Sequence, residues 1–392
     1  MFGKIGQRYL QRKQSEILKV KNRRSITKIT LMKAFGIIAV VASHTKGGAI
    51  VFPMSNWVSP YFYFMPFFVF VSGYLYNEKC DESHSGEFVL KKIKSLVLPY
   101  FLWNVFYGVL NYLLRYEKVI CYGDDINFHS LFVRPWIDGH QFHFNIPAWF
   151  LLTLFIDTML IFVIRKVLKK LKIFSDAFVL LLTFIISVFS ICYAQQGYNY
   201  GMHLCFVKVG FMLPYFQLGF VCKKREQFIT RIRHVCLPVL FLVIGLVLMV
   251  WGDVNAQVVF GNFTGSPIVI TLLTTASILS VAIISEILAP AFENNVIVKL
   301  VGDNSFTIMM HHGIIIFAVN FFLYLLSKLI DFTSFNVETF KNTLWYVCLW
   351  KDARIYIVYV IVGITVPVLL KLFYEKCILW LCNRIEKQQN SN

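Results

Sequence analysis

The stretch LMKAFGIIAVVASHTKGG, residues 31–48, is almost entirely apolar except for Lys33 and His44. The composition of the whole chain indicates whether such a stretch lies in water or in lipid. Of the 392 residues, 57% are hydrophobic, 39 are Phe and only 15% are charged, and the mean hydropathy is +0.64. These values lie far from those of soluble globular proteins. We therefore expect residues 31–48 to belong to a transmembrane helix.

Apolar runs long enough to cross a hydrocarbon core of roughly 30 Å recur along the chain. About ten are expected, near residues 29–48, 57–77, 96–114, 147–164, 175–194, 206–222, 235–251, 267–285, 305–327 and 355–374. The expected fold class is an all-α integral membrane protein whose transmembrane helices form one bundle. It would comprise a basic N-terminal arm (1–28), a transmembrane domain (29–374) and a C-terminal tail (375–392).

Basic residues orient these helices. Most of the 38 Lys and Arg residues fall in alternate connecting segments, starting with 1–28, whereas segments 195–205 and 252–266 contain none. Because basic residues collect in cytoplasmic loops, both termini are expected in the cytoplasm. The net charge of +17 then reflects this topology and attraction to anionic lipid headgroups. The lipid bilayer is an expected partner and nucleic acid is not. The nine Cys residues form no CxxC pair, and no metal site is expected.

The two ionisable residues of the first stretch share one helix face. Lys33 and His44 are eleven residues apart, which places them roughly 16 Å apart along the helix axis. Ionisable side chains within a span usually face a bundle interior or a wet cavity. The alternative is that Lys33 extends to the inner membrane surface and that His44 bonds a backbone carbonyl near the outer surface. The spacing alone leaves both interpretations open.

Four further segments follow in chain order: FMPFFVFVSGYLY (64–76), FVLKKIKSLVLPYFLWN (88–104), IPAWFLLTLF (146–155) and VGDNSFTIMMHHG (301–313). Together with the spacing of Lys33 and His44, they resemble the acyltransferase 3 family of membrane O-acyltransferases. The family commonly has arginine where this chain has Lys33. With lysine at this position, the stretch MKAFGIIAVVASH resembles the branch of fucose O-acetylases and polysaccharide O-acetyltransferases. A glutamate that many members carry shortly after the fourth-span tryptophan is absent, because FLLTLF follows Trp149.

The resemblance implies transfer of an acyl group, expected to be acetyl, from cytoplasmic acetyl-CoA to a hydroxyl. The acceptor would be a cell-surface polysaccharide or its lipid-linked sugar precursor, and the location the cytoplasmic (inner) membrane. Acetyl-CoA is thus the expected co-substrate. A transporter or flippase for a glycan or lipid intermediate is the alternative function, although the sequence shows neither the repeat nor the chain of interior acids expected of one.

His44 is the expected catalytic base, because an imidazole can accept the proton of a sugar hydroxyl near neutral pH. An acetyl-histidine intermediate is the alternative route. The resemblance places Lys33 beside the donor, where it would assist catalysis and bind the cofactor. Lys91, Lys92 and Lys94 at the cytoplasmic end of the third span are expected to bind the phosphates of the donor, or else to anchor that end at the membrane surface.

The remaining expected contacts divide between donor and acceptor. Ser72 and His312 are expected on the donor side, with helix packing and a buried structural histidine as the respective alternatives. The acceptor side draws on aromatic and polar residues of the outer loop and the start of the fourth span, which suit stacking on a sugar and hydrogen bonding to it: Trp136, Asp138, His140 and Trp149. The alternative is a polar loop that caps the bundle.

Overall fold

The computed structural model describes residues 26–45, 60–78, 84–144, 146–252, 254–330, 335–348 and 356–389. Within these ranges, nine helices are long and apolar enough to cross a membrane. The described residues also include one short antiparallel hairpin, in which Ala256 pairs with Phe263. The chain is therefore an all-α, multi-pass membrane protein, as the hydropathy pattern predicts.

The long helices make up most of the described part of the chain. In chain order they are the first helix (Ile26–His44), the continuous helix made of α4 (Ser85–Lys92), a π-helical turn (Ile93–Val97) and α5 (Leu98–Tyr116), then α7 (Trp149–Lys170), α8 (Asp176–Gln195), α9 (Gly201–Lys224), α10 (Glu226–Trp251), α11 (Pro267–Leu288), α13 (Ser305–Ser327) and α15 (Tyr356–Gln389). The shorter elements are η1 (Pro60–Phe62), α2 (Phe64–Tyr74), η3 (His129–Val133), α6 (Arg134–Ile137), η4 (Ile146–Ala148), β1 (Asn255–Gln257), η5 (Val258–Phe260), β2 (Asn262–Thr264), α12 (Val296–Asp303) and α14 (Val337–Asn342).

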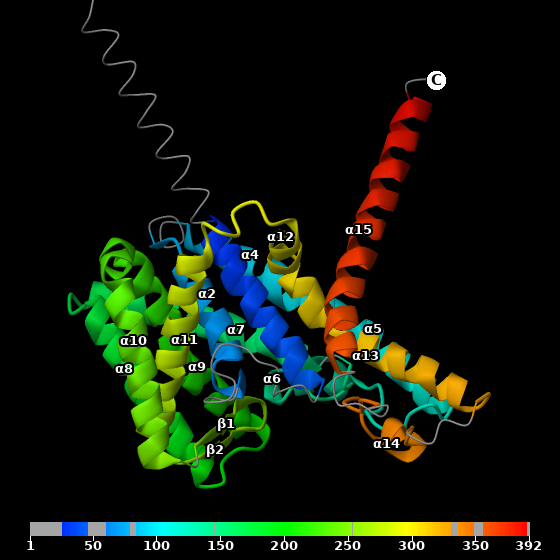
Figure 1. The fold of residues 1–392 in the computed structure, drawn as a ribbon, viewed down its shortest axis with the longest axis horizontal. Coiled ribbons are helices and arrows are strands. Elements are labelled where there is room, and N and C mark those ends of the chain that lie inside the picture. The colour runs from blue at the N-terminus through cyan, green and yellow to red at the C-terminus, as the bar shows by residue number, and fades with distance from the viewer. Residues whose placement is uncertain are drawn as a thin grey trace, which may run out of the picture.

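The short elements lie at opposite ends of the bundle. Helices α4 and α12 lie at the top of Figure 1, whereas the β1–β2 hairpin and α14 lie at the bottom. The basic residues assign the first pair of segments to the cytoplasm and the second pair to the outside. The structure separates the two groups as this topology requires, and the assignment of each side stays a prediction.

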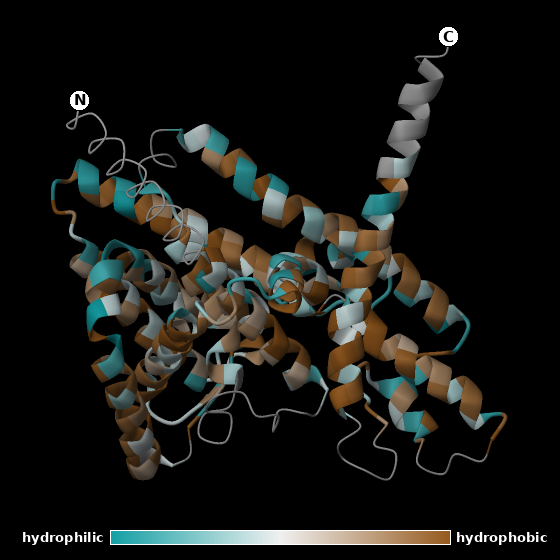
Figure 2. Cartoon of the chain, turned by 45° about the horizontal axis from the view of Figure 1, so that its top comes forward, coloured by the Kyte–Doolittle hydropathy of each residue, from teal (hydrophilic) through white to brown (hydrophobic). Residues whose placement is uncertain are grey.

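Along their lengths the helices consist mostly of hydrophobic residues, and hydrophilic residues gather toward helix ends and connections (Figure 2). Helix α10 exposes its hydrophobic residues most, because its buried share is the smallest among the candidate spans. Its exposed residues include Val239, Leu242, Leu246 and Met249. Exposed apolar side chains of this kind are favourable in contact with lipid, where the backbone polar groups are already bonded within the helix.

Three expected boundaries differ in the structure. The second expected span, 57–77, is described from Pro60 onward, and its α-helix α2 has only 11 residues, so the expected count of ten spans is not confirmed. The first helix is described from Ile26 onward, so it is already helical before residue 29. The last helix continues to Gln389, so most of the expected tail 375–392 extends the same helix. Hydropathy locates apolar runs, whereas helix ends depend on local hydrogen bonds.

The first helix lies inside the bundle and contacts several other helices. At the end expected to face the cytoplasm, the buried Lys28 pairs with Glu286 of α11 at 2.8 Å and with Glu226 of α10 at 3.4 Å, and it also donates a hydrogen bond to the hydroxyl of Tyr74 in α2. At its other end, His44 meets α13. The helix is thus held at both ends by polar contacts to helices distant in sequence.

Helices α2 and α9 approach each other so closely that backbone touches backbone. A Cβ atom on Gly73 of α2 would lie 1.9 Å from the carbonyl oxygen of Phe216, and one on Gly219 of α9 would lie 2.0 Å from the carbonyl oxygen of Phe70. Small residues at such crossings are the usual means of tight packing between transmembrane helices. Gly73, within the family-like segment 64–76, therefore has a packing role.

Substitution of Gly73 by alanine should destabilise the protein, because the added methyl group must push one backbone away from another. Overpacking of this kind costs about 1–3 kcal/mol. Gly86→Ala is the matched control, since a Cβ atom there meets nothing within 4 Å. Thermal unfolding of the purified variants in the same detergent measures the difference. If Gly73→Ala were as stable as Gly86→Ala, the close contact between α2 and α9 would be wrong.

Candidate active site

The first helix ends at His44, and hydrogen bonds fix this end. The hydroxyl of Ser43 donates to the carbonyl of Val40 at 2.7 Å, and that of Thr45 donates to the carbonyl of Ala42 at 3.0 Å. The hydroxyl of Tyr61 donates to the carbonyl of Ser43 at 2.9 Å. His44 therefore sits in the last turn of a helix, where the negative end of the helix dipole favours a positive charge.

The half-buried His44 meets the buried His312 of α13, although 268 positions separate them in sequence. Nδ1 of His44 lies 2.8 Å from Nε2 of His312. The two ring planes are 10° apart and the ring centroids are 5.1 Å apart, which fits two imidazoles joined edge to edge by this hydrogen bond. The contact connects the end of the first helix with the middle of α13.

The hydrogen bonds also assign the protons of both rings. Nδ1 of His312 lies 2.9 Å from the carbonyl oxygen of Ile308. Because a carbonyl only accepts, Nδ1 of His312 must carry a proton, and Nε2 of the neutral ring is then an acceptor. His44 consequently donates from Nδ1 to this acceptor. Nε2 of His44 is left with a free lone pair. A general base or a nucleophile requires a nitrogen in this state.

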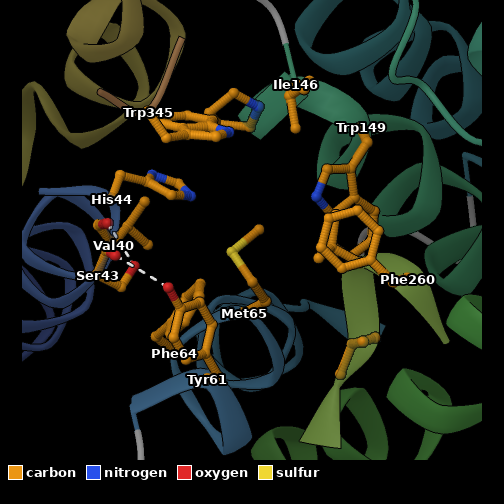
Figure 3. Close-up of a pocket in the computed structure, with 13 residues that line it drawn as sticks. Val40, Ser43, His44, Tyr61, Phe64, Met65, Ile146, Trp149, Phe260 and Trp345 are labelled. Atoms are coloured by element: carbon orange, nitrogen blue, oxygen red, sulfur yellow. Dashed lines mark hydrogen bonds between the residues drawn. The ribbon is translucent and has the colours of Figure 1, made fainter. Parts of the chain in front are cut away.

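His44 lines a cavity of about 350 Å³. Figure 3 shows its imidazole reaching into this space from one side, with Trp149 and Phe260 on the opposite side. Most of the lining is aromatic or aliphatic, and the aromatic members come from four separate stretches of the chain: Tyr61 with Phe64, Trp149, Phe260 and Trp345. Because Phe260 belongs to the connection between the two short strands, the cavity lies toward the end of the bundle that is expected to face outward.

Trp149 is held in place by α9 and by the loop before α7. The ammonium of the buried Lys208 lies 4.5 Å from the centre of the Trp149 ring and donates a hydrogen bond to the carbonyl of Asp138 at 2.9 Å. Gly139, at φ +73°, leaves room for Trp149, because a Cβ atom there would lie 2.7 Å from the Cβ of Trp149. Sequence reasoning missed Lys208. The signal was present, since it is a single lysine in the apolar stretch CFVKVGFMLPYF (205–216).

The loop before α7, which is expected to face outward, forms its own charged network. Arg134 pairs with Asp124 and Asp138, and the backbone N–H of His140 donates to the carboxylate of Asp138 at 2.9 Å. Burial alone would raise the pKa of Asp138, but these hydrogen bonds and the nearby positive charges hold it below its usual value. Burial, together with the positive charge of Lys208, lowers the pKa of His140 to about 3. The carboxylate of Asp138 is therefore charged and His140 neutral near pH 7.

Of the four expected acceptor residues, only Trp149 lines the 350 Å³ cavity within the described part of the chain. Trp136 and Asp138 instead line a much smaller space beside Lys208. His140 contacts the ring of Phe260 edge-on, with ring centroids 5.5 Å apart, and does not itself line the cavity. In the parts of the chain that the structure describes, no cluster of three or more His, Cys, Asp or Glu side chains could hold a metal.

The expected donor residues are not assembled into one described pocket. Lys33 is half-buried and, among the described residues, forms no ion pair or hydrogen bond. Lys91 and Lys94 are exposed, and the ammonium of Lys92 lies 5.6 Å from the ring centre of Phe88. Ser72 is half-buried on α2. His312, also expected on the donor side, lies instead beside His44.

Comparison with known proteins identifies a family. The family model of the acyltransferase 3 family, described as an acyltransferase domain, matches residues 26–372. No curated protein and no solved structure matches the chain. The matched region extends from the first described residue of the first helix into α15 and includes both histidines of the site.

Proposed function

This chain belongs to the acyltransferase 3 family, and from that premise we propose that it is an O-acetyltransferase acting on a surface glycan. The donor is cytoplasmic acetyl-CoA, and the acceptor is a hydroxyl of a cell-surface polysaccharide or its lipid-linked precursor. The observation that carries the proposal is the hydrogen-bonded chain from His44 through His312 to the carbonyl of Ile308. It leaves a basic nitrogen at the wall of a cavity large enough for a sugar ring.

His44 acts as the general base. Its Nε2 takes the proton of the acceptor hydroxyl as the hydroxyl oxygen attacks the thioester carbonyl carbon. The carbon–sulfur bond then breaks, and the coenzyme A thiolate leaves and receives the proton from His44. In the intervening step His44 is positively charged, and the negative end of its helix favours that state. His312 keeps the ring oriented by accepting the hydrogen bond from Nδ1.

The same geometry supports an acetyl-histidine route. In that route Nε2 of His44 attacks the thioester carbonyl carbon, and the carbon–sulfur bond breaks so that coenzyme A leaves as the thiolate. The acceptor hydroxyl then attacks the acetyl carbon, the bond between that carbon and Nε2 breaks, and the hydroxyl proton passes to the thiolate. Both routes use the same nitrogen and the same orienting bond to His312. The role proposed for His312 is therefore to position His44, in place of the donor contact expected from the sequence.

The cavity supports a sugar acceptor. Its volume of about 350 Å³ is within the range of small-ligand pockets, and the faces of Trp149 and Phe260 (Figure 3) offer apolar surfaces on which a sugar ring can lie. The Arg134 and Asp138 network, with His140, supports the wall that carries these rings. Trp136, Asp138 and His140 are proposed to shape the acceptor site from behind this wall.

The donor approaches from the cytoplasmic side of the inner membrane. Lys33 lies on the first helix roughly 16 Å below His44, a separation suited to a ligand with a charged end and a distant thioester. We assign the phosphates of acetyl-CoA to Lys33, Lys91, Lys92 and Lys94, whose charges suit them. Ser72, on the adjacent α2, is placed along the path of the donor.

Acetyl transfer by the purified protein tests this function. The protein in lipid nanodiscs is given acetyl-CoA labelled in its acetyl group and glycan isolated from cells that lack the gene. We expect the label in the glycan and its release by mild base, which cleaves esters and leaves amides intact. Glycan that crosses a reconstituted bilayer without gaining label would instead support a transporter and contradict the proposal.

A further inference from the structure

Trp345 covers one face of the catalytic imidazole. Its ring centroid lies 4.3 Å from that of His44, and the two planes are 19° apart. Figure 3 shows the indole lying over the imidazole at the cavity wall. The edge of His44 is occupied by His312, so the imidazole is held at an edge by one residue and over a face by another.

Hydrogen bonds to α13 and α15 fix the segment that carries Trp345. The backbone N–H of Trp345 donates to the hydroxyl of Thr343 at 3.2 Å. The next residue, Tyr346, accepts a hydrogen bond at its carbonyl from the side chain of Asn320 in α13 at 2.7 Å. The hydroxyl of Tyr359 in α15 donates to the same Asn320 at 2.7 Å. The indole is therefore placed by the framework of two helices.

From this geometry we infer that Trp345 is a positioning residue that stabilises the positively charged state of His44 during acetyl transfer. The face of an indole carries negative electrostatic potential and attracts a cation placed over it, most strongly where water is excluded. His44 becomes such a cation when it takes the hydroxyl proton, and an acetylated imidazole carries the same charge. The inference rests on the proposed function and holds for either route.

Two other roles would also place an indole here, and they differ in their consequences. If Trp345 only restricts the rotation of His44, the shape of the ring matters and its electron distribution does not. If Trp345 binds the acceptor, its alteration should raise KM for the glycan. Stabilisation of charged His44 predicts instead a fall in kcat with KM unchanged, and a dependence on the electron density of the ring.

Fluorinated tryptophans at position 345 separate these roles, because fluorine withdraws electron density from the indole face with little change in shape. With one to four fluorines incorporated by nonsense suppression, kcat should fall stepwise, by about 5- to 30-fold over the whole series. KM for both substrates should stay constant. The same series at Trp103 is the matched control, because that ring contacts His311 edge-on at 4.3 Å and should leave kcat unchanged.

The results also distinguish this inference from the proposed function. If the protein with ordinary tryptophan transfers acetyl groups and kcat stays flat across the series at position 345, the inference is wrong and the function stands. A rise in KM for the glycan without a change in kcat would likewise overturn it, in favour of acceptor binding. If the unmodified protein transfers no acetyl group, the proposed function itself fails.

Discussion

Replacement of His44 by glutamine should reduce acetyl transfer by roughly 10²- to 10⁴-fold, the usual contribution of a general base. Glutamine keeps the polarity and approximate length of the side chain but cannot accept a proton at neutral pH. Binding of acetyl-CoA should change little, because the proposed phosphate contacts lie roughly 16 Å away along the helix. Transfer and donor binding are measured on the same purified samples.

Two companion variants make the His44 result interpretable. His44→Ala should lose at least as much activity, since it also removes the hydrogen bond to His312. His203→Gln is the matched control: this half-buried histidine of α9 bonds the hydroxyl of Tyr193 at 2.8 Å and does not line the described cavity. Near-normal transfer by His44→Gln would show that another residue is the base and that the catalytic role proposed for His44 is wrong.

Much of the fold was predictable because lipid imposes a simple rule on the sequence. A chain that crosses hydrocarbon must satisfy its backbone within each segment, so most spans appear as long apolar runs. The segment 57–77 was harder, because its described part combines a short turn with the 11-residue α2. Apolar composition marks such a segment as buried without revealing how much of it is helical, particularly where it packs against α9 rather than lipid.

The site was predictable only in part, for a different reason. Two polar residues in one apolar helix, Lys33 and His44, are visible as exceptions within a local pattern. The contact of His44 with His312 joins positions 268 residues apart, and that with Trp345 depends on how a loop returns to the bundle. Such contacts depend on how the helices pack. Residues that meet in this way have no fixed spacing in the sequence, so a single sequence does not reveal them. Lys208 was visible as a local exception and was overlooked.

The arrangement of the two histidines determines what removal of His312 should do. His312→Leu removes the acceptor for the Nδ1 proton of His44, so the ring can rotate or move its proton to Nε2, where it no longer acts as a base. Loss of the orienting group in a comparable hydrogen-bonded triad lowers kcat by about 10⁴-fold. We expect a loss of about 10²-fold or more in kcat here, with KM for acetyl-CoA unchanged.

The split between kcat and KM distinguishes the donor contact expected for His312 from the positioning role proposed for it. A donor contact would appear as a higher KM for acetyl-CoA, with kcat recovered at saturating donor, whereas a positioning role lowers kcat at any donor concentration. His312→Gln should retain more activity than His312→Leu, because the amide oxygen can accept the proton of His44. His311→Leu is the neighbouring control, since His311 bonds the hydroxyl of Tyr107 at 2.7 Å instead of His44. If excess acetyl-CoA restored the activity of His312→Leu, His312 would be a donor contact. Trp345 would then be the residue that orients His44.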